Sequence, residues 1–216
     1  MSGLISWQPL RATAIADEFG RVLARWFALH KELGPALDLY LSAQYQRSTH
    51  LENRFLNTAG AAEAYHRRTD PPPADVVDKH HERVKRITKA FPDKNDREWL
   101  RWKLKYAYEP SFADRLEQLT ERCSEVLGSW LGDAAAFAER VSDARNLLVH
   151  RDPSPEAELP GGRDILDMAE DVALVLLVCL YQDLDVDNDR IREMLQRTPR
   201  WRFLEFRKRG WRDVTP

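Results

Sequence analysis

Apolar residues recur every three or four positions over most of this chain, which is the spacing that amphipathic helices produce. The pattern predicts helices at residues 10–33, 35–46, 49–68, 75–90, 96–108, 111–131, 133–150 and 165–181. Gly34-Pro35 predicts the end of the first helix and the start of the second, because proline is favoured in a first turn. Ser111 is a predicted N-cap, and the prolines at 71–73 predict a helix end. Since no strand pattern is present, the predicted fold class is all-α, an up-and-down helical bundle with insertions.

The composition is that of one ordinary globular domain. The chain has 216 residues, 43% of them hydrophobic, which is enough for one sizeable core. We expect a single domain over 1–216, with its core at about 10–195 and a basic, aromatic extension at 196–216. Cys123 and Cys179 occupy apolar helical positions, so we expect buried thiols in a reducing compartment. Residues 172–181 form a fully apolar run that is too short to cross a bilayer, so we expect a fully buried helix there. No signal peptide is recognised, and the expected location is cytoplasmic.

The predicted helix at 133–150 has two distinct faces. Its core face consists of Phe137, Val141, Ala144 and Leu148. A polar stripe with the same spacing lies on the opposite side and consists of Glu139, Asp143, Asn146 and His150. The helix therefore presents an amide and an imidazole, one turn apart, on the side away from the core.

Arg145, Asn146 and His150 are the candidate catalytic residues. Arginine matches phosphate oxygens with a rigid fork of donors, and histidine both gives and takes protons near neutrality. The amide of Asn146 is suited to orienting the ring or a ligand. On an ideal helix Arg145 lies roughly 140° around from His150, so one copy does not easily aim both at one phosphate. The alternative interpretation is a solvated helix end, with a cation at the negative pole of the helix dipole.

A homodimer formed through this helix resolves the geometry. Two helices packed about a two-fold axis bring both copies of Arg145, Asn146 and His150 into one composite cleft. RNA cleavage by its own 2′-hydroxyl needs a base for that proton and an acid for the leaving 5′-oxygen, and two imidazoles can divide this work. Arg145 then neutralises the charge that develops on the phosphoryl oxygens.

Charge is uneven along the chain, although the formal total is only −2. Basic residues outnumber acidic ones at 79–105 and again at 190–212, where aromatic residues are interleaved with them. These segments suit RNA, and the candidate RNA-binding residues are Lys85, Arg86, Lys89, Arg101, Arg200, Arg202, Arg207 and Lys208. The alternatives are a solvated pair of helices at 79–105 and a tail whose Trp201, Phe203 and Phe206 pack on the bundle while its arginines face water.

No metal or cofactor is expected. His80 and His81 are adjacent on a helix and point about 100° apart, which is poor geometry for one metal and indicates a structural or solvent role. No pair of Cys or His has the spacing of a zinc site, and no glycine-rich phosphate loop is present. This pattern favours a metal-independent mechanism.

Four blocks resemble the Apea-like HEPN family, which occurs in bacterial anti-phage proteins. They are Asp38-Leu39-Tyr40-Leu41-Ser42, the run from Leu51 to Leu56, the run from Ala62 to Arg68, and Arg145-Asn146 through His150 with Asp143 just before. The resemblance covers roughly residues 10–195. It implies a helical bundle that dimerises through the motif helices and cleaves RNA without metal, leaving cyclic-phosphate and 5′-hydroxyl ends.

By this resemblance Arg145, Asn146 and His150 carry catalysis, with Glu63 and Asp143 in supporting roles. Full-length relatives have a β-rich domain upstream, so we expect an upstream sensor domain or a regulatory partner. The predicted function is an endoribonuclease of abortive infection that acts on transfer RNA or messenger RNA. The alternatives are a non-catalytic HEPN module that binds nucleic acid, a nucleotide or a partner protein, and an inert helical scaffold.

Overall fold

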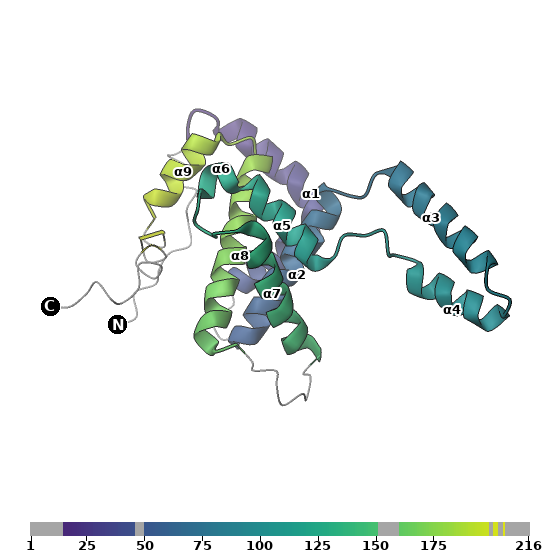
Figure 1. The fold of residues 1–216 in the computed structure, drawn as a ribbon. Coiled ribbons are helices and arrows are strands. Elements are labelled where there is room, and N and C mark those ends of the chain that lie inside the picture. Colours follow the sequence, from purple (N-terminus) through teal and green to yellow (C-terminus); the bar gives the residue numbers. More distant parts are fainter. Residues whose placement is uncertain (1–14, 46–49, 151–159, 199–200, 203–204, 206–216) are drawn as a thin grey trace.

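The structure, a computed structural model, is built from helices (Figure 1), and it describes residues 15–45, 50–150, 160–198, 201–202 and 205. The helices are α1 (Phe19–Tyr45), α2 (Leu51–Thr69), α3 (Ala74–Lys89), α4 (Lys94–Leu104), α5 (Phe112–Arg122), α6 (Ser124–Leu127), α7 (Ala134–His150), α8 (Gly162–Asp183) and α9 (Asn188–Gln196). Strands are absent from the described residues. The prediction of an all-α helical bundle is confirmed.

The core is organised around α8, which runs through the middle of the bundle (Figure 1). Every residue from Met168 to Tyr181 is buried, as expected for a helix that is apolar on all sides. α2 packs between α1 and α8, and α5 lies against both α7 and α8. The prediction of a buried helix over 172–181 is therefore confirmed. None of the described helices is both long and apolar enough to span a membrane.

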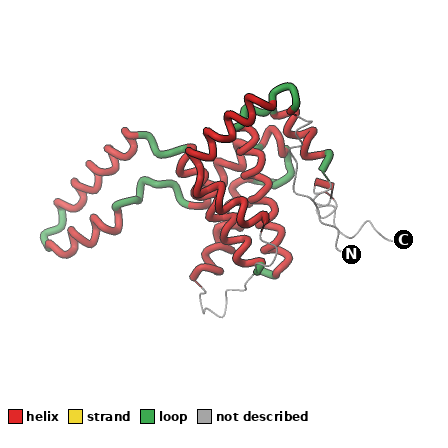
Figure 2. Tube along the Cα trace, turned by 180° about the vertical axis from the view of Figure 1, so that it is seen from behind, coloured by secondary structure: helices red, strands yellow, loops and turns green. Residues whose placement is uncertain are grey.

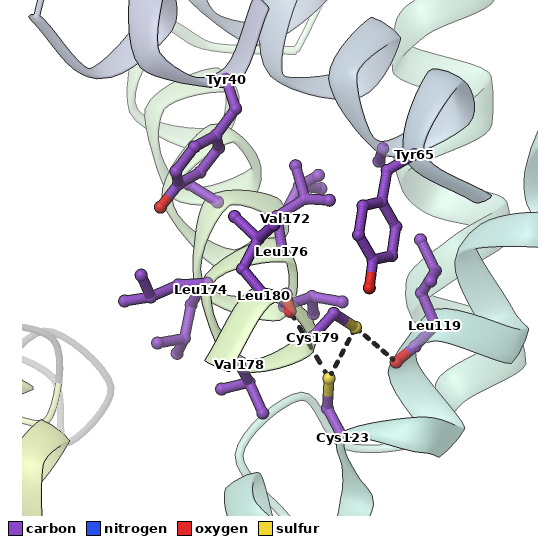
Figure 3. Packing of buried hydrophobic residues seen from close by; sticks show 14 of the residues in the cluster. Tyr40, Tyr65, Leu119, Cys123, Val172, Leu174, Leu176, Val178, Cys179 and Leu180 are labelled. Carbon is purple, nitrogen blue, oxygen red and sulfur yellow. Dashed lines mark hydrogen bonds between the residues drawn. The ribbon is translucent and has the colours of Figure 1, made fainter. Parts of the chain in front are cut away.

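The two cysteines meet inside this core (Figure 3). Both thiols are free and buried, and their sulfur atoms lie 3.3 Å apart. Cys123 also donates to the carbonyl oxygen of Val175 at 3.4 Å. The hydrogen bond with Cys179, together with burial, holds the pKa of the Cys123 thiol well above its ordinary value. These contacts join the end of α5 to α8.

The predicted break at Gly34-Pro35 is wrong, because α1 continues through Pro35. A proline inside a helix costs about 3 kcal/mol or more. Leu33 and Leu37, on either side of it, are both buried, and burying a leucine contributes about 1.5–3 kcal/mol each. Packing against α2 therefore offsets the local preference for a break.

The predicted single helix at 111–131 is also wrong in part. α5 starts as expected at Ser111, whose side chain accepts from the backbone of Asp114 while the Asp114 carboxylate accepts in return, a complete capping box. The helix then ends at Cys123, and the short α6 closes at Gly128, which adopts a left-handed φ of 55°. The apolar spacing continues across this turn because α6 still faces the core, with Val126 and Leu127 buried.

The start of the C-terminal extension packs on the bundle. α9 was not predicted; Asp187 caps it, and its buried residues are Ile191, Met194 and Leu195. Trp201 beyond it is buried and its ring lies 4.7 Å from that of Trp130. The packing interpretation of the tail is therefore confirmed for Trp201, whereas Phe203 and Phe206 lie outside the described residues.

α3 and α4 form a two-helix arm that stands away from the bundle in both views (Figures 1 and 2). The two helices pack on each other, and His80 bonds to the carbonyl oxygen of Leu104 at 2.7 Å. The ring of His80 also lies 5.3 Å from that of Tyr108. The predicted structural role of His80 is confirmed. We refer to residues 74–108, which comprise the two helices and the turn that follows α4, as the arm.

Candidate active site

α7 carries the predicted motif and has the two predicted faces. Phe137, Val141 and Ala144 are buried, and Leu148 packs against the core from its edge. The four residues of the polar stripe, Glu139, Asp143, Asn146 and His150, are all exposed. The helix starts at a cap in which Asp133 accepts from the backbone N–H of Ala136 at 2.8 Å. The 3.6-residue period therefore gives the correct orientation of this helix.

Arg145 leaves α7 toward α2 and α5, on the other side of the helix from Asp143. Its Nη2 donates to Oε2 of Glu63 at 2.9 Å, and its guanidinium lies 5.0 Å from the centre of the Phe112 ring. The side chain is 31% exposed. The bond to Glu63 uses one of the five N–H groups of a guanidinium. Glu63 and Phe112 therefore orient an arginine that solvent can still reach.

Glu63 belongs to a chain of ion pairs that leads to the base of the arm. It accepts from Arg67 at 3.2 Å, and Arg67 in turn contacts Glu109 at 2.8 Å. Glu109 also accepts from Arg115 at 3.1 Å. Glu109 lies just before the start of α5, where the chain returns from the arm. The position of Arg145 is thus coupled to the segment that joins the arm to the bundle.

His66 lies buried at the end of this chain. Nη1 of Arg115 donates to its Nδ1 at 3.1 Å, so Nε2 carries the proton and donates to Gln118 at 2.6 Å. Burial lowers the pKa of His66 below its ordinary value, and the neighbouring positive charge of Arg115 lowers it further. Gln118 and Asp70 act in the opposite direction. The folded protein therefore favours the neutral imidazole.

We expect His66 to make stability depend on pH. The unfolded chain takes up a proton near the ordinary pKa of 6.5, and the folded chain does so only at lower pH. The contribution is therefore complete above pH 6.5 and declines as the pH falls through this value toward the folded pKa. Urea unfolding at about pH 7.5 and about pH 5.5 measures the effect. The free energy of unfolding of His66→Gln is expected to fall less between these values than that of the wild type, and an equal fall in both would contradict this.

Asp143 faces a different environment from Arg145. A groove of about 830 Å³ lies between α7 and α8, and Asp143 is one of its lining residues. The acidic residues on its walls are Glu139, Asp143, Asp164, Asp167 and Asp171, and Arg140 is the basic one. The structure therefore does not bring Asp143 together with Arg145, but places it in a strongly acidic groove.

Asn146 and His150 lie between these two environments, on the exposed side of α7. His150 is the last residue of the helix, and its neighbour Val149 is 54% exposed. Within one copy, Arg145 is directed toward Glu63 and is not gathered into a cluster with His150. For one phosphate to contact both Arg145 and His150, a second copy of the chain would have to supply one of the two side chains. The alternative is a substrate that extends along the helix and contacts them at different phosphates.

The other predicted RNA-binding residues are spread over two regions. Lys85, Arg86, Lys89 and Arg101 are exposed on the arm, and Arg202 is exposed beside Trp201. Arg200, Arg207 and Lys208 lie outside the described residues. The structure thus leaves four of the candidates on one projecting element.

Comparison with known families identifies the chain. The profile of the family described as Apea-like HEPN matches residues 56–190, well over half of the 216 residues. The chain belongs to the Apea-like HEPN family. The matched region includes Glu63 and the whole of α7. HEPN domains are typically ribonucleases. No curated protein and no solved structure is similar enough to the chain to match it.

Sequence reasoning missed part of the environment of Arg145 in this HEPN domain. Arg67, Glu109 and Phe112 come from separate segments, and only the spacing of Glu63 and Arg67 by four residues could have indicated a pair. It also missed the exposed Trp99 and Trp102 of the arm, whose spacing by three residues was a visible signal.

Proposed function

We propose that this HEPN protein is a metal-independent endoribonuclease whose active site consists of Arg145, Asn146 and His150. The observation that carries the proposal is the orientation of Arg145 by Glu63 and the Phe112 ring, on a helix whose exposed side also bears His150. Glu63 and the Phe112 ring fix the guanidinium in one direction and leave its other N–H groups for a ligand. Such preorganisation is what stabilisation of a developing charge requires.

The reaction follows from these groups. One imidazole takes the proton of the RNA 2′-hydroxyl, and the resulting oxygen attacks the adjacent phosphorus. The bond from phosphorus to the 5′-oxygen breaks, and a second imidazole gives that oxygen a proton. The products are a 2′,3′-cyclic phosphate and a 5′-hydroxyl, with no net change in protons. His150 supplies both imidazoles if two copies share the cleft, and Asn146 orients the ring.

Two features support a homodimer formed through α7. The exposed side of the helix carries an apolar residue, Val149, next to His150. Its polar stripe continues to Asp143 at the rim of the α7–α8 groove, so a second α7 would meet a continuous surface. We assign the RNA to the side of α7 that bears Arg145, because the acidic groove repels a polyanion. Asp143 then supports the dimer surface or orients water and does not touch the phosphate.

A second candidate is a non-catalytic HEPN module that binds nucleic acid, a nucleotide or a partner protein. The observation that favours it is that one copy directs Arg145 toward Glu63 and away from His150. A chain that never pairs would retain a phosphate-binding arginine without a shared cleft. The oligomeric state therefore separates the two candidates.

The experiment that tests the proposal uses the purified full chain and total bacterial RNA in the presence of a chelator. We expect cleavage that the chelator does not suppress, and we expect fragments that carry cyclic-phosphate and 5′-hydroxyl ends. Ligation chemistry specific for each type of end identifies them. Intact RNA at protein concentrations where the chain is dimeric would refute the proposal. From the family context, we propose that the protein acts in abortive infection in the bacterial cytoplasm. Its target would be transfer RNA or messenger RNA, and an upstream sensor or a regulatory partner would control it.

A further inference from the structure

The arm has a thin interior of its own and a second apolar face that is exposed in the part of the chain that the structure describes. The least exposed positions of α3 are Val77, His80, Val84 and Thr88, and those of α4 include Leu100 and Leu104. They recur every three or four residues, which marks the sides that the two helices turn toward each other. This packing explains the hairpin but leaves the far side of α4 without a structural role.

That far side carries three exposed aromatic rings. Trp99 is 59% exposed, Trp102 is 71% exposed and Tyr106 is 57% exposed. Trp99 and Trp102 are three residues apart, so they share one side of α4, well away from Leu100, and Tyr106 follows in the turn just after the helix. We call these three residues the aromatic stripe. Large rings gathered on one exposed surface indicate an interaction site, because isolated proteins seldom leave such a patch in water.

Cations accompany the stripe. The ammonium of Lys103 lies 4.9 Å from the centre of the Trp102 ring, and that of Lys105 lies 4.7 Å from the centre of the Tyr106 ring. Over residues 79–105 basic residues clearly outnumber acidic ones. The ligand that matches alternating rings and ammonium groups is a polyanion with exposed flat bases. Bases in a duplex are stacked on each other, so the match is to a single strand.

The arm is also positioned to serve the cleavage site. The segment that returns from the arm to the bundle contains Glu109, whose ion pair with Arg67 leads through Glu63 to Arg145. The arm leaves the bundle on the side where the C-terminal half of α7 lies (Figures 1 and 2). RNA held on the arm would thus approach from the side of α7 that bears Arg145 and avoid the acidic α7–α8 groove.

We propose that the aromatic stripe of the arm captures single-stranded RNA, with bases stacked on Trp99 and Trp102 and phosphates paired with neighbouring lysines. This deepens the proposed ribonuclease function and rests on it for its biological purpose. Binding itself does not require cleavage. Capture on a projecting element would let the enzyme select unpaired regions of a folded RNA.

The test measures binding of a fluorescent single-stranded RNA of about 20 nucleotides to the full chain in a His150→Ala background, which prevents cleavage. Trp99→Ala/Trp102→Ala is expected to weaken binding at least tenfold, since base stacking on aromatic rings accounts for roughly this factor per ring. Trp99→Phe/Trp102→Phe keeps a π-face and is expected to restore most of the affinity. The matched control is Phe27→Ala on α1, which removes another ring that is 66% exposed and should change affinity less than twofold.

The alternatives give distinct results. Equal binding by the alanine variant and the wild type, or equal binding of a duplex of the same sequence, would overturn the proposal. Binding to vesicles that contain phosphatidylserine, without binding to RNA, would also overturn it and would assign the stripe to a membrane. Loss of the dimer in the alanine variant would overturn it too and would assign the stripe to contact with a second copy. If RNA binds through the stripe but the wild type cleaves nothing, the ribonuclease function fails and the capture function stands.

Discussion

Replacement of His150 by alanine is expected to lower the rate of RNA cleavage by about 10²–10⁴-fold, the range that a general acid or base contributes. The fold should be unaffected, because the side chain is exposed at the last position of α7. Its interaction with the helix dipole contributes at most about 1 kcal/mol at an exposed site. The measurements are the cleavage rate of a defined single-stranded RNA and the thermal midpoint of unfolding. The control is His30→Ala, which removes an exposed imidazole from α1.

Mixtures of the two proteins test whether the imidazoles are shared. If each cleft needs His150 from both copies, a dimer of one wild-type and one His150→Ala chain is inactive. The activity per wild-type chain should then fall as the variant is added in excess and subunits exchange. Independent sites would keep that activity constant. A constant value would leave the endoribonuclease intact but would reject the composite cleft.

The orientation of α7 could be predicted from the sequence because it depends on one local property. Apolar residues at helical spacing define the buried side, and Phe137 and Val141 are indeed buried. Exposure of Asn146 and His150 then follows from the same period. The capping box at Ser111 was equally predictable, because its partners are three residues apart.

The features that were missed depend on packing between distant segments. Continuation of α1 through Pro35 depends on the burial of Leu33 and Leu37 against α2, which no local signal reports. The contact of Arg145 with Glu63 joins residues 82 positions apart in the chain. Family resemblance indicated that Glu63 matters, but it did not indicate how. The structure supplies that geometry, including the ring of Phe112 beneath the guanidinium.

Replacement of Arg145 by lysine is expected to reduce kcat by about 10²–10³-fold, the loss that follows removal of one donor to a developing oxyanion. Lysine keeps the positive charge, so it can still pair with Glu63, but it lacks the planar fork that contacts two phosphoryl oxygens. Because Arg145 is 31% exposed, its ion pair contributes only about 0–1 kcal/mol to folding, and the thermal midpoint should change little. A large loss of rate without a loss of stability is the signature of a catalytic contact.

Arg140→Lys provides the matched control for this substitution. Arg140 lies on the same helix, and its guanidinium lies 5.8 Å from the centre of the Phe137 ring, much as that of Arg145 lies over Phe112. It faces the acidic groove, however, on the side that we assign away from RNA. Arg140→Lys should therefore cleave RNA at nearly the wild-type rate. Equal losses of cleavage rate in the two variants would mean that α7 needs arginine for its structure. A rise in KM with unchanged kcat for Arg145→Lys would mean that Arg145 binds RNA without stabilising the transition state. Charge, helix and a ring contact are matched between the two positions, so a loss of rate confined to Arg145→Lys would be assigned to the site that Arg145 forms with Glu63 and the reacting phosphate.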